Sequence, residues 1–189
     1  MKNEMSKLLR RKLMEGKHTD KYDYGCVMVY MKVNPEDWNN LSDMIDDEDL
    51  YLGENGDRGY GFETEPHVTI LYGLHGDIPL ETVEDIINQM KRPEIKMQKV
   101  SSFNNPKFGV LKFDVESSDL HNENKKLTKL PHTTDYPDYH PHATIAYIKP
   151  DRIDHYVDKF KDINPVDVVV EKIVYSMVDG TKKEYSFVD

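Results

Sequence analysis

One eight-residue segment occurs twice in this chain of 189 residues. Residues 65–72 read EPHVTILY and residues 140–147 read HPHATIAY, so five of the eight positions are identical. A loop is expected before each copy, and a helix with a proline near its start is expected after it. Solenoid folds need several short repeats, so one repeat with a long period predicts two related lobes instead.

Side chains alternate along a β-strand, and this alternation says what each copy presents. Each strand offers an imidazole and a hydroxyl on one face and apolar side chains on the other. The polar pairs are His67 with Thr69 and His142 with Thr144. The apolar sets are Val68, Ile70 and Tyr72 in the first copy and Ala143, Ile145 and Tyr147 in the second. If the lobes pack about a pseudo-twofold axis, both polar pairs line one cleft.

Two imidazoles in one cleft suit the cleavage of a phosphodiester, because histidine titrates near neutral pH and can be present in both protonation states. A neutral ring would accept the proton of a ribose 2′-hydroxyl, and a protonated ring would donate one to the departing 5′-oxygen. Thr69 and Thr144 would donate hydrogen bonds to the non-bridging oxygens, where charge builds up in the transition state. The pattern does not say which histidine is the base, and a duplicated structural strand is the competing interpretation.

A metal site is another interpretation of the second copy. His140 and His142 could project to one face of the predicted strand. The polar loop before it offers further candidate ligands, namely His132, Asp135 and Asp138. No third ligand has a spacing diagnostic of zinc, and loops often carry scattered His and Asp, so we expect no metal and no other cofactor.

Hydrophobic periodicity predicts an α+β fold with two similar lobes. Strands are expected over residues 25–33, 67–73, 95–103, 109–115, 142–148, 166–177 and 185–188. Helices are expected over residues 35–46 and 118–130, and from residues 79 and 150 onward. Asn34 can cap the first of these helices, with Pro35 at its first position, and Ser117 or Ser118 can cap the helix over residues 118–130. Asp179 and Gly180 predict the turn of the last hairpin.

The charge balance limits what the chain can bind. The sequence contains 25 Lys and Arg and 35 Asp and Glu, which gives a net charge of −10 at pH 7. This argues against sequence-independent binding to long DNA or RNA, which depends on cationic contacts to phosphate. A small anionic ligand in a local pocket remains open. The scattered lysines Lys99, Lys107 and Lys112 could supply local positive charge, but such lysines are usually part of the solvated surface, so no role is assigned to them.

Cys26 is the single cysteine, so no intrachain disulfide or cysteine metal cluster can form, which fits a reducing cytosol. The longest apolar stretch, residues 26–31, is far shorter than the roughly 20 residues of a transmembrane helix, so no membrane contact is expected.

Two regions are distinguished along the chain. Residues 1–20 form a basic amphipathic segment without the apolar core of a signal peptide, and residues 21–189 form a single domain. The pattern leaves open whether the loops over residues 47–65 and 132–140 close over a ligand.

The two motifs, HVTI at residues 67–70 and HATI at residues 142–145, resemble those of the two-histidine phosphoesterase superfamily, in which each lobe carries one His-x-Thr/Ser motif followed by an apolar residue. Within it the chain is most similar to the phage anti-CBASS phosphodiesterases, which destroy the cyclic oligonucleotide messengers of a bacterial immune system. The resemblance covers residues 24–189. It implies a bilobal α+β fold, with two pseudo-symmetric lobes and concave antiparallel sheets around a central cleft.

The resemblance also implies an activity. It is the metal-independent hydrolysis of 3′–5′ bonds in cyclic di- and trinucleotides such as 3′,3′-cyclic GMP-AMP, in the cytoplasm of the infected bacterial host cell. We expect the protein to act as a monomer. The resemblance implies that His67 and His142 are the acid–base pair. It also implies that Thr69 and Thr144 bind the phosphate.

The family also places an aromatic residue of the first strand and an acidic residue of a late strand near the ligand. Tyr30 and Glu171 are the candidates in this chain, and Tyr24 is an alternative to Tyr30. Tyr30 could equally be a core residue, because strands favour tyrosine. A carboxylate inside an apolar strand is costly unless it is paired or used, although an edge strand could leave Glu171 in water.

Three other functions compete with this interpretation. One is RNA end processing or cleavage of 2′,3′-cyclic phosphate termini, and a second is a non-catalytic sponge that binds a cyclic nucleotide and releases it unchanged. The third is a structural or interaction protein, for which the paired motifs would be incidental.

Overall fold

The computed structural model describes residues 22–53 and 59–188, and the amphipathic segment predicted over residues 1–20 lies outside them. The described part contains seven strands, four α-helices and one 3₁₀ turn, which confirms the α+β class. The strands are β1 (Gly25–Val33), β2 (His67–Leu74), β3 (Lys96–Asn104), β4 (Gly109–Glu116), β5 (His142–Ile148), β6 (Val168–Ser176) and β7 (Lys182–Tyr185). The helices are α2 (Pro35–Asp43), α3 (Leu80–Ile87), α4 (Ser118–Leu127) and α5 (Ile153–Phe160), and the 3₁₀ turn is η1 (Asp47–Asp49).

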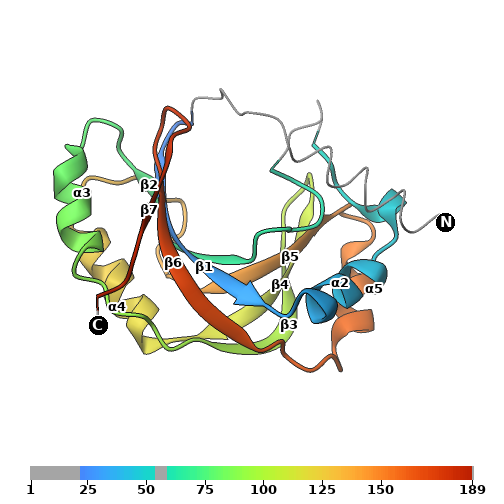
Figure 1. Cartoon of the computed structure of the whole chain (residues 1–189). Helices are drawn as coiled ribbons and strands as arrows, with labels where there is room; N and C mark the ends of the chain where they lie inside the picture. The colour runs from blue at the N-terminus through green and yellow to red at the C-terminus, as the bar shows by residue number, and fades with distance from the viewer. Residues whose placement is uncertain (1–21, 54–58, 189) are drawn as a thin grey trace.

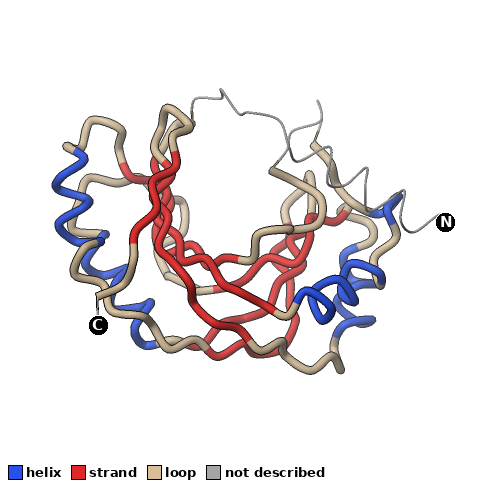
Figure 2. Tube along the Cα trace, viewed as in Figure 1, coloured by secondary structure: helices blue, strands red, loops and turns tan. Residues whose placement is uncertain are grey.

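All seven strands form one antiparallel sheet with the order β3-β4-β5-β2-β1-β6-β7 (Figure 2). The sheet is strongly curved, and the α-helices lie outside the curve (Figure 1). Helix α4 packs against β2 and α3, whereas α5 packs against β3 and β4. The concave face of the sheet is therefore left without a helix in the described part of the chain.

The sequence predicted separate concave sheets in two lobes, whereas the strands of both halves belong to one sheet. The halves join where β2 pairs with β5, and Val68 lies opposite Ala143 at this junction. One half contains β1, β2, β6 and β7, and the other contains β3, β4 and β5. The repeated segments are thus neighbours at the centre of the sheet.

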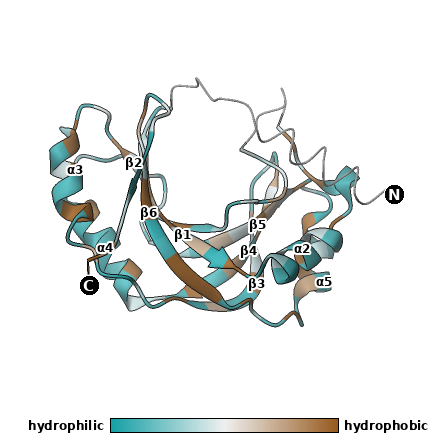
Figure 3. Ribbon diagram, viewed as in Figure 1, coloured by the Kyte–Doolittle hydropathy of each residue, from teal (hydrophilic) through white to brown (hydrophobic). Residues whose placement is uncertain are grey.

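The hydrophobic core fills the space between the outer face of the sheet and the helices, which carry both apolar and polar faces (Figure 3). Val68 and Ile145 of the central strands are fully buried in it. Trp38 of α2 packs against the rings of Phe62 and Phe113, with centroids 6.0 and 6.5 Å away. None of the helices in the described residues is long and apolar enough to cross a membrane.

Two helices begin at the capping residues that the sequence indicates. The Asn34 side chain accepts a hydrogen bond from the Glu36 N–H at 3.0 Å, and Pro35 occupies the first helical position of α2. Ser117 caps α4, because its hydroxyl accepts from the Leu120 N–H at 3.2 Å. These bonds satisfy N–H groups that have no partner within the first turn.

Several element boundaries differ from the prediction. The last strand spans residues 182–185 rather than 185–188, because the turn at Gly180 closes at once and pairing with β6 begins directly after it. The helices predicted to end at residues 46 and 130 stop about one turn earlier, where the hydrogen bonds tighten to the i→i−3 pattern.

Each repeated strand contains a bulge at the same position. The register of β1 against β2 skips Ile70, and the register of β4 against β5 skips Ile145. An extra residue in one strand reverses the alternation of the side chains beyond it. The prediction that Tyr72 and Tyr147 lie on the buried apolar face is therefore wrong, since both line a cleft on the concave side and Tyr72 is 51% exposed.

Both bulges leave a carbonyl that needs a donor from outside the ladder. The Asn124 amide of α4 donates to the Ile70 carbonyl at 2.7 Å, and the Glu63 N–H donates to the Ile145 carbonyl at 2.8 Å. The described ends of the predicted loop over residues 47–65 therefore do not stand free, because the segment around Glu63 is bonded to β5. Residues 54–58 of that loop lie outside the described residues.

Candidate active site

The pairing of β2 with β5 brings the two repeated motifs side by side. Their register places His67 beside Thr144 and Thr69 beside His142 on the concave face of the sheet. The central residue of each motif is fully buried and points to the opposite face. Two imidazoles and two hydroxyls therefore share one surface, although the motifs lie far apart in the sequence.

The two imidazoles are held in the same way. Nδ1 of His67 lies 2.9 Å from the Glu65 carbonyl oxygen, and Nδ1 of His142 lies 2.9 Å from the His140 carbonyl oxygen. A carbonyl oxygen only accepts, so this geometry assigns a proton to Nδ1 of each ring. Nε2 then accepts a proton when the ring is neutral and donates one when it is charged.

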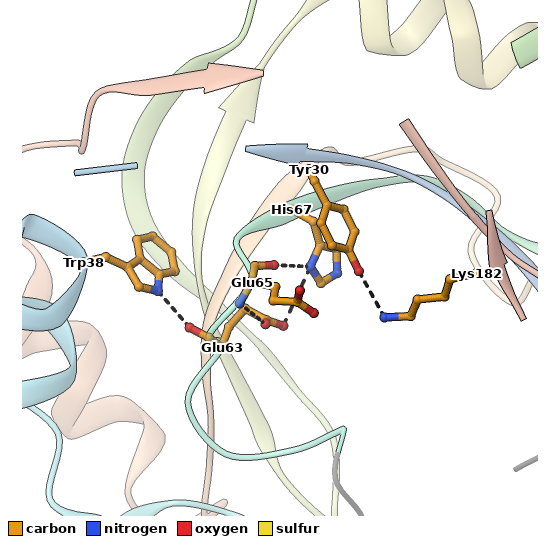
Figure 4. A network of polar contacts seen from close by, with 6 residues as sticks. All are labelled: Tyr30, Trp38, Glu63, Glu65, His67 and Lys182. Atoms are coloured by element: carbon orange, nitrogen blue, oxygen red, sulfur yellow. Dashed lines mark hydrogen bonds and ion pairs between the residues drawn. The ribbon is translucent and has the colours of Figure 1, made fainter. Parts of the chain in front are cut away.

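The surroundings of His67 come from β1 and from the segment before β2 (Figure 4). The Tyr30 ring stacks on the imidazole with centroids 5.4 Å apart and an interplanar angle of 25°. A carboxylate oxygen of Glu63 lies 3.8 Å from the His67 Nδ1. Glu63 is itself fixed, because its carbonyl accepts from the Trp38 indole at 2.8 Å and its side chain accepts from the Glu65 N–H at 2.8 Å. His67 therefore has an anion as its neighbour.

His142 has an aromatic and cationic neighbourhood. The Phe103 ring meets it edge to face with centroids 4.9 Å apart, and the Lys112 ammonium lies 4.1 Å from the centre of that ring. Burial lowers the pKa of His142 below its ordinary value of 6.5, and the charges of Lys112 and His67 lower it further. The backbone hydrogen bond of the ring and the Asp114 carboxylate act in the opposite direction but do not outweigh these effects. The neutral form of His142 is thus favoured at pH 7.

Lys112 is buried, unlike the solvated lysines that its sequence context suggests, and it has a role that was not assigned to it. Its ammonium donates to Asp114 at 2.5 Å and to the Ser101 hydroxyl at 2.7 Å. The β4–β5 register sets Lys112 opposite Thr144 and Asp114 opposite His142. Burial acts to raise the pKa of Asp114, but the hydrogen bonds from Lys112 and Ser101 bring it below its ordinary value. The alternation of Lys112 and Asp114 along a predicted strand was the signal that could have found this pair.

Tyr30 is the predicted aromatic residue that the structure brings to the motifs, since it pairs with His67 in the β1–β2 register. Lys182 of β7 donates to the Tyr30 hydroxyl at 3.2 Å. Burial raises the pKa of Tyr30 against the lowering effect of Lys182, so the phenol is neutral. The alternative, Tyr24, stacks on His75 instead, with centroids 6.1 Å apart. Nothing in the sequence pointed to Lys182, because the last strand was expected further along the chain.

Glu171 is exposed on β6, at the irregularity where β6 skips a residue against β1. The β6 residue opposite Tyr30 is Lys172, whose ammonium forms an ion pair with Glu184 at 2.7 Å. No hydrogen bond or ion pair joins Glu171 to either motif in the described residues. An exposed carboxylate pays no cost of burial, so the argument that Glu171 must be paired or used does not apply.

The zinc interpretation finds no ligand set in residues 22–53 and 59–188, where no three His, Cys, Asp or Glu side chains are grouped so that they could hold a metal ion. His132 instead bonds the Leu130 carbonyl through Nδ1 at 2.8 Å. It lines the cleft together with His140 and His142.

Two adjoining clefts flank the histidines. The larger has a volume of about 630 Å³, and its lining includes Thr69, His142 and Thr144. The smaller has a volume of about 390 Å³, and its lining includes Tyr30, His67 and Lys182. Tyr147, which the bulge turns to this side, lines both. The arrangement offers space on both sides of a phosphate held between the imidazoles.

Comparison with known proteins gives a fold and a family. No curated protein matches the chain. A structure of Usb1 from Kluyveromyces marxianus superposes with a TM-score of 0.54 at 7% identity and covers 87% of this chain and 98% of that one, which shows a shared fold. A second Usb1 structure from the same organism, with uridine monophosphate, has a TM-score of 0.48 at 8% identity and covers 86% of this chain and 97% of that one.

The family model of the anti-CBASS protein Acb1 matches residues 61–184, a segment that contains both histidine motifs and all the described strands except β1 and the last residue of β7. The likeness to anti-CBASS proteins expected from the motifs is thereby confirmed, and the chain belongs to the anti-CBASS protein Acb1 family.

Proposed function

We propose that this protein is a phage anti-CBASS phosphodiesterase that hydrolyses 3′–5′ bonds of cyclic di- and trinucleotide messengers, such as 3′,3′-cyclic GMP-AMP, inside the infected bacterium. The observation that carries the proposal is the antiparallel pairing of the two His-x-Thr motifs on one concave face, in a chain of the anti-CBASS family. Such an enzyme removes the signal on which the host's immune response depends. It acts as a monomer, because one chain supplies both motifs.

The two histidines take different roles because their neighbours differ. His142 is the general base, since burial and the Lys112 charge favour its neutral form. His67 is the general acid, and the Glu63 carboxylate 3.8 Å away provides a counter-charge for its protonated ring. Nε2 performs the proton transfer in both cases, because Nδ1 is committed to a backbone carbonyl.

The reaction begins when Nε2 of His142 removes the proton of a ribose 2′-hydroxyl. The 2′-oxygen attacks the adjacent phosphorus, and the bond from phosphorus to the 5′-oxygen breaks while Nε2 of His67 protonates that oxygen. Thr69 and Thr144 donate hydrogen bonds to the non-bridging oxygens as their charge increases. The ring opens to a linear nucleotide with a 2′,3′-cyclic phosphate end, which a water molecule hydrolyses when the two histidines exchange roles.

The clefts fit the size and the charge of such a substrate. The nucleosides on either side of the scissile phosphate occupy the two adjoining clefts of about 630 and 390 Å³. Tyr30 offers an aromatic face next to His67, and stacking of a base on an aromatic ring needs no particular sequence. A cyclic dinucleotide carries only two phosphates, so a protein with a net charge of −10 can bind it in a local pocket. The same net charge disfavours the binding of long RNA, which needs many cationic contacts to phosphate.

The test is incubation of the purified protein in excess EDTA with 3′,3′-linked and 2′,3′-linked cyclic di- and trinucleotides, followed by mass spectrometry. We expect linear products from the wild-type protein and none from the double variant His67→Ala/His142→Ala. RNA with 2′,3′-cyclic phosphate ends is included in parallel. Faster turnover of these ends than of any ring would establish the end-processing function, whereas tight binding with recovery of intact rings would establish the sponge.

A further inference from the structure

We propose that Lys182 binds the second, non-scissile phosphate of the cyclic substrate and so makes the site selective for rings over single phosphodiesters. The inference rests on the proposed function and deepens it. It concerns a residue of β7 that lies close to the reacting groups in space without belonging to either motif.

The position of Lys182 follows from the register of the sheet. Lys182 lies opposite Ser176 on β6, and its side chain is on the concave face, where its ammonium reaches the Tyr30 hydroxyl at 3.2 Å. The Tyr30 ring stacks on the His67 imidazole, and the ammonium lies off the hydroxyl end of that ring (Figure 4). All three side chains line the cleft of about 390 Å³. The ammonium is therefore in the same cleft as the His67 imidazole and contacts it through Tyr30 rather than directly.

The charge of Lys182 is available to a ligand. Lys112 and Lys172, which lie on the same concave face, are neutralised by ion pairs with Asp114 at 2.5 Å and Glu184 at 2.7 Å. Lys182 forms no ion pair within the described part of the chain, and its hydrogen-bond partner is a neutral phenol.

The groups of the described residues that interact electrostatically with the Lys182 ammonium include Tyr30, Glu65, Tyr22 and Cys26. None of them is a carboxylate in hydrogen-bond contact with it. When a phosphate enters the cleft, Lys182 can donate to a charged acceptor instead of the neutral Tyr30 hydroxyl. Hydrogen bonds between charged partners are among the strongest in proteins.

The geometry assigns Lys182 to a phosphate other than the one that is cleaved. The scissile phosphate lies between the imidazoles and the two threonines, where the pairing of β2 with β5 concentrates the donors. The ammonium off the hydroxyl end of Tyr30 lies outside that cluster of donors, and we place it at the phosphate on the other side of a nucleotide that stacks in the cleft. A substrate with one phosphodiester has no second phosphate for Lys182 to bind, whereas every cyclic dinucleotide has one.

The experiment compares two substrates and three variants. The substrates are 3′,3′-cyclic GMP-AMP and the linear dinucleoside monophosphate GpA, and the variants are Lys182→Met, Tyr30→Phe and Lys183→Met. Lys183 is the matched control, because it is the next residue of β7 and bonds Glu84 on the outer face. For Lys182→Met we expect KM for the ring to rise about tenfold with little change for GpA. Lys183→Met is expected to leave both substrates unchanged.

Two kinetic results would overturn the inference. Equal losses on the ring and on GpA would place Lys182 at the scissile phosphate, and an equal loss in Tyr30→Phe would show that Lys182 only orients the tyrosine. The affinity of the 2′-deoxy analogue of the ring, measured calorimetrically, separates the inference from the proposed function because it needs no turnover. If Lys182→Met binds the analogue tenfold more weakly but the wild-type protein turns over no ring, the phosphate site is supported and the proposed enzymatic function is refuted. If the wild-type protein turns over the ring but Lys182→Met binds the analogue as tightly as the wild type does, the enzymatic function is supported and the phosphate site is refuted.

Discussion

His67 and His142 make the same hydrogen bond, each from Nδ1 to the carbonyl oxygen two residues earlier and each at 2.9 Å. The bond fixes the tautomer and the orientation of both rings, so that Nε2 is the reactive nitrogen in each half of the site. The surroundings then break this symmetry, since Glu63 lies beside one ring and Lys112 acts on the other. A duplicated strand thereby provides an acid and a base from the same three-residue motif.

Replacement of either imidazole removes a proton-transfer group. His67→Ala and His142→Ala are each expected to lower kcat for ring opening by about 10²–10⁴-fold, which is the usual contribution of general acid–base catalysis. His155→Ala is the control, because that histidine lies on α5 on the outer side of the sheet. Single-turnover rates measured by chromatography check the expectation, and a loss below threefold in either site variant would contradict it.

The pH dependence follows from the lowered pKa of His142. The base acts in its neutral form, so kcat/KM should rise with pH through an acid limb that lies below 6.5, the ordinary value for histidine. Removal of the nearby cation in Lys112→Met stabilises the protonated ring, so the limb should move to higher pH. The exposed residue Lys161, which pairs with Asp158 on α5, gives the matched control Lys161→Met. If the acid limb lies at the same pH in Lys112→Met as in the wild type, the Lys112 charge does not affect the pKa of His142, whatever the change in the maximal rate.

The bulge at Ile70 depends on a single side chain. Asn124→Ala removes the donor to the Ile70 carbonyl and leaves that group without its partner, which should lower the free energy of unfolding by about 1–2 kcal/mol. Asn122→Ala, two positions earlier on the exposed face of α4, is expected to change it far less. Urea denaturation of both variants measures the difference, and equal midpoints would show that the bulge does not need Asn124.

Gly73 is required by its backbone and by its neighbour. Its φ is +116°, and a Cβ atom built on it would lie 2.0 Å from the Thr133 carbonyl oxygen. Gly73→Ala should therefore destabilise the protein by more than about 1 kcal/mol. At Gly59 a Cβ would meet nothing within 4 Å, so Gly59→Ala serves as the control. Thermal unfolding distinguishes the two variants, and an unchanged midpoint for Gly73→Ala would count against the described contact.

Local patterns predicted most of the elements because they depend on neighbours in the sequence. The caps at Asn34 and Ser117 were visible as residue types in the right place, and both helices begin there. The directions of Tyr72 and Tyr147 were not predictable, since a bulge depends on the register between two strands and one inserted residue reverses every side chain after it.

In the candidate site too, local motifs were predictable from the sequence, whereas contacts made by strand pairing were not. The repeated motif pointed to four polar residues, and the sheet brings them together on one face. Lys112 and Lys182 were missed because their roles depend on strands that pair across the sheet, and composition places lysines on the surface. Glu171 was selected from the family resemblance and from its apolar context, and neither shows the irregularity at which β6 leaves it exposed.

The most direct test of the two-histidine mechanism is a comparison of 3′,3′-cyclic GMP-AMP with the same ring built from 2′-deoxyribose, each incubated with the protein in EDTA and analysed by mass spectrometry. The mechanism predicts that the ribose ring is opened to a linear nucleotide with a 2′,3′-cyclic phosphate intermediate and that the deoxy ring stays intact, because it lacks the 2′-hydroxyl from which His142 takes the proton. Opening of the deoxy ring at a comparable rate, or survival of both rings, would contradict it.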